Sequence, residues 1–310
     1  MSQTNYDNVA YYGLDIGGTK MEIGLFDEAY SLIESWRVPT PTDCYQTFLA
    51  CIKALISDAD KRCTTPGKIG IGMPGIIDAQ GLVKSANVPC ATGHPIKADL
   101  THMLKRDIAI ANDCQLFALS ECHGGAGDAK PVVYGAIIGT GAGGGLCING
   151  KLLQSKNNVA GEYGHLPVSA ALTRKYNLPI RHCGCGLTGC AESYIAGPGL
   201  AWLYKHFGGL QQSTSLFVAQ LRDNDAIAKQ TFDCYIDLLG ASIATLTLSY
   251  DPDVIVIGGG LSKIDEIIEA LPQATQNHVF SGIKLPLITH ARYGDSSGVR
   301  GAAILGSQDA

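Results

Sequence analysis

The feature that most constrains the fold is a pattern that occurs twice along the chain. Residues 11–26 carry two apolar runs around the turn Gly17-Gly18-Thr19, and residues 132–146 carry two apolar runs around Gly139-Thr140-Gly141. A shift of 122 positions places one pattern on the other. Each copy is typical of a strand, a tight turn and a second strand. We infer an internal duplication, with one copy in each of two domains.

The rest of the chain alternates between helix and strand patterns. Apolar residues recur at helical spacing over residues 45–61 and 232–250, whereas residues 108–113 and 254–257 are short apolar runs typical of buried strands. A last helix is expected to begin near Val299. A chain of 310 residues with this alternation is predicted to form two α/β domains.

Composition narrows the class of protein. Hydrophobic residues make up 46% of the chain and charged residues 16%, which is too apolar for a disordered protein. The net charge of −5 disfavours a nucleic-acid partner, and no apolar run reaches the ~18 residues of a membrane-spanning helix. The N-terminus lacks the basic start and apolar centre of a secretory signal. We therefore expect a cytoplasmic protein whose 11 cysteines are thiols or metal ligands rather than disulfides.

Three glycine clusters that follow apolar runs are candidate phosphate-binding loops. Glycine lets backbone N–H groups approach phosphate oxygens, and threonine hydroxyls add donors. Taken alone, each cluster is more simply a hairpin turn, but the repetition favours phosphate binding. Asp15 is placed to hold Mg²⁺ through water. A Walker A sequence is absent, and the first cluster leads into a strand, which excludes a Rossmann loop. The candidate ATP-binding residues are Gly13, Asp15, Gly17, Gly18, Thr19, Lys20, Gly139, Thr140, Gly141, Gly143, Gly258, Gly259 and Gly260.

The run Asp15-Ile16-Gly17-Gly18-Thr19-Lys20, taken with Gly139-Thr140-Gly141, resembles the superfamily of sugar kinases, Hsp70 and actin. This resemblance implies an α/β fold of two duplicated ribonuclease-H-like domains, as in actin and hexokinase. It also implies that ATP binds with Mg²⁺ in the cleft between the domains.

Three cysteines lie close together at Cys183, Cys185 and Cys190, with intervening glycines that allow a tight turn around one ion. Three thiolates require a fourth ligand to complete a tetrahedral zinc site. His165 is the better candidate for this ligand. His182 is its rival, although a residue adjacent to Cys183 is sterically awkward. The remaining cysteines lie singly on apolar segments and are expected to be free.

The run Gly161-Glu162-Tyr163-Gly164-His165, followed by the cysteine cluster and Ala191-Glu192, resembles the ROK family (repressor, open reading frame, kinase). The likeness extends from residue 11 to about residue 308. It implies a structural zinc ion held by His165, Cys183, Cys185 and Cys190. With four protein ligands no position is open for water activation, so the zinc knuckle is expected to orient substrate-binding residues.

The same resemblance implies the domain organisation and a homodimer. The N-terminal α/β domain is expected to comprise residues 1–122, with a C-terminal helix at about 299–310 packed back on it. The C-terminal α/β domain is expected to comprise residues 123–298 and to carry the zinc knuckle.

The resemblance also assigns Asp113, which ends a buried strand, as the base that accepts the proton of the sugar hydroxyl. From the residues alone, a helix N-cap explains Asp113 equally well. The chain departs from the family at Cys114-Gln115, where Ala-Asn is usual. The residues expected to bind the sugar are Gly75, Asn87, Asn112, Glu162, His165 and Glu192.

The loop from Ser85 to Pro95 resembles that of bacterial N-acetylglucosamine kinases, and its small pair Ala91-Thr92 leaves room for an N-acetyl group. We therefore expect ATP-dependent phosphorylation of N-acetyl-D-glucosamine to N-acetyl-D-glucosamine 6-phosphate. The alternatives within the family are a fructokinase, a mannokinase or a glucokinase. The non-enzymatic alternative is a sugar-sensing regulator, although the ten residues before the first strand are too few for a DNA-binding module.

Overall fold

A computed structural model describes residues 5–210 and 213–308 and divides the chain into two compact units. Unit 1 comprises Met1–Gly125, Lys151–Ala160 and Tyr293–Ala310, and unit 2 comprises Ala126–Gly150 and Gly161–Arg292. The last two residues of the expected C-terminal helix, 309 and 310, lie outside the described residues. No helix of the described chain is long and apolar enough to cross a membrane.

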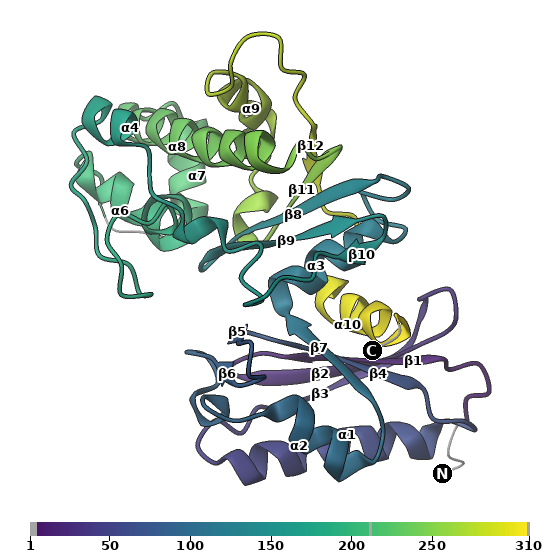
Figure 1. Ribbon diagram of the computed structural model, residues 1–310. Helices are drawn as coiled ribbons and strands as arrows, with labels where there is room; N and C mark the ends of the chain where they lie inside the picture. Colours follow the sequence, from purple (N-terminus) through teal and green to yellow (C-terminus); the bar gives the residue numbers. More distant parts are fainter. Residues whose placement is uncertain (1–4, 211–212, 309–310) are drawn as a thin grey trace. The chain divides into compact units, whose positions relative to one another are not determined.

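Unit 1 is built on a five-stranded sheet in the order β3-β2-β1-β4-β7 (Figure 1). The strands β1, β2 and β3 are antiparallel, whereas β1, β4 and β7 run parallel. The carboxyl ends of these three parallel strands therefore meet at one edge of the sheet. The strands are β1 (Tyr11–Ile16), β2 (Lys20–Phe26), β3 (Leu32–Pro39), β4 (Lys68–Met73) and β7 (Ile108–Asn112), and the short strands are β5 (Ile76–Ile77), β6 (Val83–Lys84) and β10 (Lys151–Leu152).

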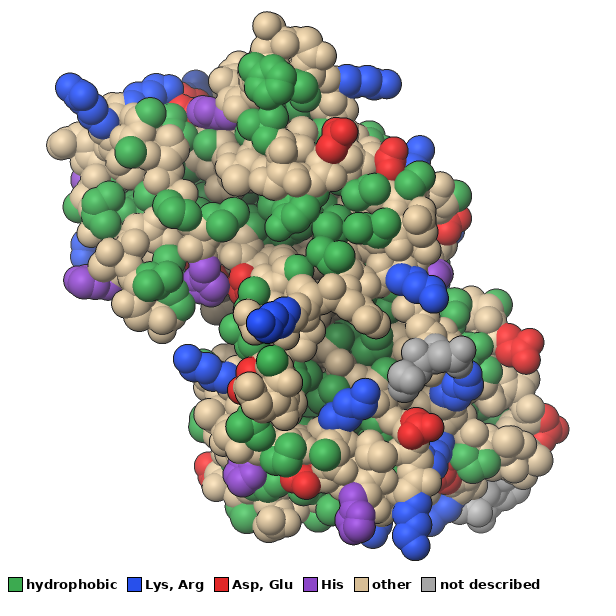
Figure 2. Space-filling model, in the orientation of Figure 1, with side chains coloured by type: hydrophobic (Ala, Val, Ile, Leu, Met, Phe, Trp, Pro, Cys, Tyr) green, Lys and Arg blue, Asp and Glu red, His purple; other side chains and the backbone are tan. Residues whose placement is uncertain are grey.

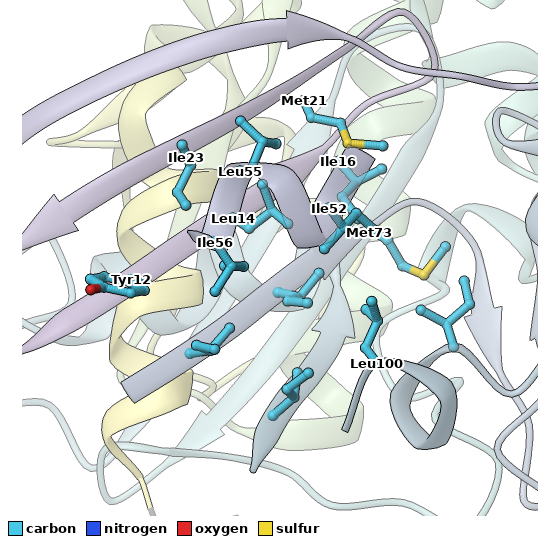
Figure 3. Packing of buried hydrophobic residues seen from close by; sticks show 14 of the residues in the cluster. Tyr12, Leu14, Ile16, Met21, Ile23, Ile52, Leu55, Ile56, Met73 and Leu100 are labelled. Carbon is cyan, nitrogen blue, oxygen red and sulfur yellow. The ribbon is translucent and has the colours of Figure 1, made fainter. Parts of the chain in front are cut away.

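Helices cover both faces of the sheet in unit 1. One face carries α1 (Tyr45–Arg62) and α2 (Ile96–Leu104), and the other carries α3 (Asp113–Cys122) and α10 (Ser297–Ser307) (Figure 1). The apolar residues of α1 recur every three to four positions, so they form one stripe that is buried against the sheet. Figure 3 shows this stripe packed on the side chains of β1 and β2. Two short 3₁₀ helices, η1 (Pro89–Ala91) and η4 (Gly294–Ser296), complete the unit.

The contact between α10 and the sheet is made backbone to backbone. A Cβ atom added to Gly13 in β1 would lie 1.9 Å from the Val299 carbonyl oxygen, and one added to Gly70 in β4 would lie 1.8 Å from that of Ala302. A Cβ added to Gly301 would lie 2.0 Å from the Leu116 carbonyl oxygen in α3. Only glycine fits at these positions, and α10 therefore packs closely on β1, β4 and α3 at once.

Unit 2 repeats the core of this topology. Its main strands follow the order β9-β8-β11-β12, in which β8 pairs antiparallel with β9 and parallel with β11, as β1 does with β2 and β4. This arrangement confirms the α/β fold with a duplicated strand–turn–strand unit. The strands are β8 (Val132–Ile138), β9 (Ala142–Ile148), β11 (Val254–Gly258) and β12 (Leu287–His290).

The helices of unit 2 gather around α8 (Ala226–Tyr250), which packs on α9 (Asp265–Gln276), α6 (Gly197–His206), α7 (Thr214–Arg222) and α5 (Glu192–Ile195). The sequence pattern predicted the start of α8 six residues late, at Phe232. The helix begins earlier because the Asp225 side chain accepts a hydrogen bond of 2.8 Å from the Ala228 N–H and caps it. The remaining elements are α4 (Ala170–Lys175) and the 3₁₀ helices η2 (Tyr163–His165) and η3 (Gly260–Lys263).

The segment Lys151–Ala160 belongs to unit 1, although the sequence placed it in the C-terminal domain. Side-chain hydrogen bonds account for the difference. The Asn158 amide donates to the Ile77 carbonyl over 2.8 Å, and the Gln115 amide donates to the Asn158 and Ala160 carbonyls over 3.4 Å each. All eleven cysteines are free of disulfides.

Replacing Gly70 with alanine is expected to destabilise unit 1 by about 2 kcal/mol or more, because the new Cβ would overlap the Ala302 carbonyl of α10. The check is the thermal unfolding midpoint, with Gly260→Ala as the control, because a Cβ added at Gly260 meets no atom within 4 Å. Equal midpoints for the two variants would contradict the close packing of α10.

Candidate functional site

Two carboxylates lie together where the parallel strands of unit 1 end. Asp15 is the penultimate residue of β1, and Asp113 directly follows β7. Both side chains are partly buried. Burial, reinforced by the negative charge of Asp113, raises the pKa of Asp15 to about 6. Burial also raises the pKa of Asp113 above its usual value. Two acidic groups with raised pKa values at one sheet edge are typical of a site that handles protons or metal–phosphate charge.

The first turn of α10 lies beside Asp15. A Cβ added to Gly298 would lie 2.4 Å from a carboxylate oxygen of Asp15. The positive end of the helix dipole therefore faces this carboxylate and partly offsets the cost of its burial.

The structure separates the two explanations of Asp113 that the sequence left open. Helix α3 begins at Asp113, but its N-cap is Asn112, whose side-chain oxygen accepts a hydrogen bond of 2.8 Å from the Cys114 N–H. Asp113 accepts from the same N–H over 3.0 Å, and burial leaves its pKa raised. The capping role thus belongs to Asn112, and the Asp113 carboxylate is not needed for it.

The two residues that depart from the family pattern have structural roles at this cap. Gln115 completes the capping box, because its side-chain oxygen accepts a hydrogen bond from the Asn112 N–H over 3.4 Å. Its amide nitrogen reaches the carbonyls of Asn158 and Ala160. The longer side chain of Gln115 therefore joins α3 to the segment Lys151–Ala160.

Other predicted residues of unit 1 lie around the same edge. The Asn112 amide donates to the Gly75 carbonyl over 2.9 Å, and Gly75 has a positive φ of 104°. A Cβ added to Gly18 would lie 2.9 Å from the Asn87 carbonyl oxygen, so the Gly17–Thr19 turn adjoins the loop that carries Asn87. Asn87, Thr19 and Lys20 are exposed.

Thr40 holds the first glycine turn and was not identified from the sequence. Its hydroxyl donates to the Gly17 carbonyl over 2.7 Å, and its N–H donates to the Thr19 carbonyl over 3.1 Å. Thr40 lies between Pro39 and Pro41, and nothing in this short sequence indicates a contact with the glycine turn. Gly13, by contrast, lies in the middle of β1, and the close approach of α10 accounts for its lack of a side chain.

In unit 2, two of the predicted glycine loops lie next to each other. The Gly139 N–H donates to the Gly141 carbonyl over 2.9 Å and closes the turn between β8 and β9. A Cβ added to Gly139 would lie 3.6 Å from the Gly260 nitrogen, and Gly259 adopts a positive φ of 85°. Gly143 lies within β9, and Gly258 ends β11.

The N-terminus of α6 joins these loops, and the sequence analysis did not include it. The Gly197 N–H donates to the Gly139 carbonyl over 2.7 Å. The pair Gly197-Pro198 at the first turn of a helix is the signal that identifies such an N-terminus. This bond uses the Gly197 N–H and Pro198 has none, so the start of α6 positions the Gly139–Gly141 turn rather than supplying these donors to a ligand.

Four potential metal ligands of unit 2 converge on one point. One ligand atom each from His165, Cys183, Cys185 and Cys190 lies within 4.8 Å of all the others. The Cys185 and Cys190 sulfurs are 3.7 Å apart, and the Cys183 sulfur lies 3.7 Å from His165 Nδ1. Neighbouring sulfurs around a tetrahedral zinc ion lie about 3.8 Å apart, so the donor set and its spacing fit zinc. His182 is not part of this cluster and instead pairs with Thr188.

Two glutamates connect the metal cluster to the rest of unit 2. Glu162 Oε2 lies 3.7 Å from His165 Nε2, the ring nitrogen that faces away from Cys183. Glu192 accepts a hydrogen bond of 2.8 Å from the Ala142 N–H, and its other oxygen lies 3.8 Å from the Cys183 sulfur. Glu192 therefore links the Gly139–Gly141 turn to the metal cluster.

Comparison with known proteins identifies the family: the chain belongs to the ROK family, whose model matches residues 11–309. It is 49% identical over 296 residues to the N-acetylgalactosamine kinase AgaK of Shewanella sp. (strain ANA-3), with 96% of each chain covered. It is 43% identical over 298 residues to an N-acetyl-D-glucosamine kinase of Shigella boydii serotype 4, with 95% of this chain and 98% of the relative covered.

Among solved structures, the chain is similar to a ROK family glucokinase from Streptomyces griseus in complex with glucose and AMPPNP. The two chains are 26% identical with a TM-score of 0.76, over 96% of this chain and 99% of the glucokinase. These matches confirm the family resemblance and the two-domain α/β fold that it implied.

Asp15→Asn is expected to raise the stability of unit 1 at pH 7.5 by about 1–3 kcal/mol, because it removes a partly buried charge. The pKa of Asp15 in the folded protein is about 6, above the ordinary value of 3.8 for an aspartate. Its ionisation therefore lowers stability progressively as pH rises from about 4 through about 6.

Thermal unfolding at pH 7.5 and pH 5 tests whether ionisation of Asp15 lowers the stability of the folded protein. The variant should unfold at a higher temperature than the wild type at pH 7.5, by a margin that shrinks at pH 5. A margin that is unchanged or larger at pH 5 would contradict the raised pKa.

Proposed function

We propose that this chain transfers the γ-phosphoryl group of MgATP to O6 of an N-acetyl-D-hexosamine. Membership of the ROK family and full-length similarity to named sugar kinases make the chain an ATP-dependent sugar kinase. The observation that carries the mechanism is the carboxylate pair Asp15 and Asp113, with raised pKa values at one sheet edge.

Asp113 is the proposed base. Its carboxylate accepts the proton of the sugar hydroxyl as O6 forms a bond to the γ-phosphorus, and the bond to the β-phosphate oxygen breaks to release ADP. Burial raises the pKa of Asp113, which makes its carboxylate a stronger base than that of a solvent-exposed aspartate. Asp15 lies at the neighbouring strand end, where its charge suits a water-mediated contact with the Mg²⁺ of MgATP.

The glycine turns are the proposed phosphate contacts. Their backbone N–H groups, with the Thr19 and Thr140 hydroxyls, supply donors without obstructing side chains. In unit 2 the proximity of Gly139 to Gly260 and the hydrogen bond from Gly197 support this role.

His165, Cys183, Cys185 and Cys190 are the proposed ligands of one zinc ion. Because four protein ligands complete the tetrahedron, zinc supplies structural cross-linking rather than an activated water. His165 binds through Nδ1 in this arrangement, which leaves Nε2 beside Glu162. The knuckle thereby orients His165, Glu162 and Glu192 as sugar-binding residues.

The N-acetyl group is the proposed specificity feature, because both similar relatives are kinases of N-acetylhexosamines. Asn87, Asn112 and Gly75 lie close to the carboxylate edge and are assigned to the sugar. N-acetyl-D-glucosamine is the substrate favoured by the loop from Ser85 to Pro95. N-acetyl-D-galactosamine, its C4 epimer, is the second candidate because the kinase named for it is 49% identical. A homodimer in the cytoplasm remains a prediction.

A coupled assay of ADP release, with MgATP and a panel of sugars, tests the substrate. The panel holds the two N-acetylhexosamines together with N-acetylmannosamine, glucose, fructose and mannose. We expect the highest kcat/KM with one of the first two. A preference for an unsubstituted hexose would reject the N-acetyl assignment, and absence of any sugar-dependent ADP would favour the sugar-sensing regulator.

Asp113→Asn is expected to lower kcat by about 10²–10⁴-fold, because the amide cannot accept the hydroxyl proton. The fold and the binding of AMPPNP should persist. Asp107→Asn, a substitution of an exposed aspartate in the same unit, is the matched control and should leave kcat unchanged. Turnover by Asp113→Asn within a few-fold of the wild type would remove Asp113 from the mechanism.

The purified chain is expected to contain one zinc ion, and Cys185→Ser to lose it with a fall in the thermal unfolding midpoint. Cys44→Ser, which changes an exposed cysteine outside the cluster, is the control and should retain zinc. Elemental analysis after gel filtration measures the metal content. Equal zinc in both variants would exclude the proposed ligand set.

A further inference from the structure

A groove in unit 1 adjoins the carboxylate edge and shares Asn112 with it. It has a volume of about 580 Å³ and follows β7, the outermost strand of the sheet, along Ala109, Ile110 and Ala111. Asp15, Asn87 and Asp113 do not line it. Its volume falls within the ~300–1,000 Å³ range of small-molecule sites.

The charge of this groove is opposite to that of the chain. Lys97, Lys151 and Lys156 line it, and Asp78 is its only acidic residue, although the chain as a whole carries a net charge of −5. One Asp78 oxygen already accepts hydrogen bonds of 2.9 Å from the Gln80 and Leu82 N–H groups. Within the described ranges, no hydrogen bond or ion pair engages the three lysine side chains. On the face drawn in Figure 2, basic and acidic side chains both lie among apolar and other side chains.

A buried polar atom in the wall of the groove lacks a partner. The Ser155 hydroxyl oxygen is inaccessible to solvent and makes no hydrogen bond. An unsatisfied buried hydroxyl costs about 1–3 kcal/mol, so such atoms in functional sites commonly await a ligand or a bound water. Three cations and an unpartnered hydroxyl line the same groove, and this donor set suits an oxyanion.

The wall that carries these groups is held in place from two sides. The Asn158 amide ties the segment Lys151–Ala160 to the Ile77 carbonyl, and the Gln115 amide ties it to the start of α3. Three of the four groups, Lys151, Ser155 and Lys156, come from this segment, and Lys97 comes from α2. The donors are therefore presented by anchored parts of the chain.

We propose that this groove is a second binding site, for a small phosphate-bearing metabolite of sugar-phosphate size. Its phosphate group contacts Lys97, Lys151 and Lys156, and a rotation of the Ser155 side chain about its Cα–Cβ bond brings the unpartnered hydroxyl to the same phosphate. A phosphate monoester carries up to two negative charges and three acceptor oxygens, which matches this donor set better than a single carboxylate does. Asn112 and Gln115 also line the groove, so an occupant touches the cap of the helix that begins with Asp113.

Calorimetric titration with glucose 6-phosphate, in phosphate-free buffer at constant ionic strength, tests the site. The key variant is Lys97→Gln/Lys151→Gln/Lys156→Gln. The matched control removes the same charge from lysines of unit 2, as Lys205→Gln/Lys229→Gln/Lys284→Gln. We expect the control to bind like the wild type and the groove variant to bind about tenfold or more weakly. Ser155→Ala should weaken binding by a smaller factor.

Several outcomes would overturn the proposal. Binding that is unchanged in the groove variant would place the ligand in another site. Absence of binding to the wild type at millimolar concentration would exclude a sugar phosphate. Equal affinity for inorganic phosphate and for glucose 6-phosphate would show an anion site without a place for the sugar. Far-ultraviolet circular dichroism and retained kinase activity would show that the groove variant is folded.

Discussion

The structure of unit 1 depends on the backbone contact between α10 and the sheet. Gly13 and Gly70 let the carbonyls of Val299 and Ala302 approach β1 and β4, and Gly301 lets α3 approach the same helix. The Arg300 guanidinium extends the contact by donating to the Ser120 carbonyl over 2.7 Å. Because α3 and β1 carry the two acidic residues of the site, the position of α10 determines where both carboxylates lie.

This packing explains how two acidic groups are accommodated at one edge of the sheet. Asp15 and Asp113 are partly buried, and the charge of Asp113 adds to the cost of ionising Asp15, while the first turn of α10 offsets part of that cost. In the proposed mechanism, this costly arrangement places the base Asp113 beside a carboxylate suited to Mg²⁺. In unit 2 the metal cluster has a comparable organising role, since it fixes His165 between the cysteines and Glu162.

Most of the fold was predictable because its signals are local. Short apolar runs beside glycine turns identified most of the core strands, helical apolar spacing identified α1, and the cysteine spacing with His165 identified the metal cluster. The contacts that sequence reasoning missed are long-range and made by ordinary residues. Thr40 contacts the first turn through a hydroxyl, Gly197 contacts the second through its backbone, and Gln115 holds the segment Lys151–Ala160 in unit 1. Contacts of this kind leave no periodic pattern of apolar residues in the sequence.

The central claim is that these residues direct the γ-phosphoryl group to one hydroxyl of an N-acetylhexosamine. Nuclear magnetic resonance of the product formed from MgATP and isotopically labelled N-acetyl-D-glucosamine or N-acetyl-D-galactosamine measures this directly. The account predicts one ADP per sugar consumed and phosphorus–carbon coupling confined to C6 and its neighbour C5. Phosphate attached at C1 or another carbon, or ADP formed without a phosphorylated sugar, would contradict it.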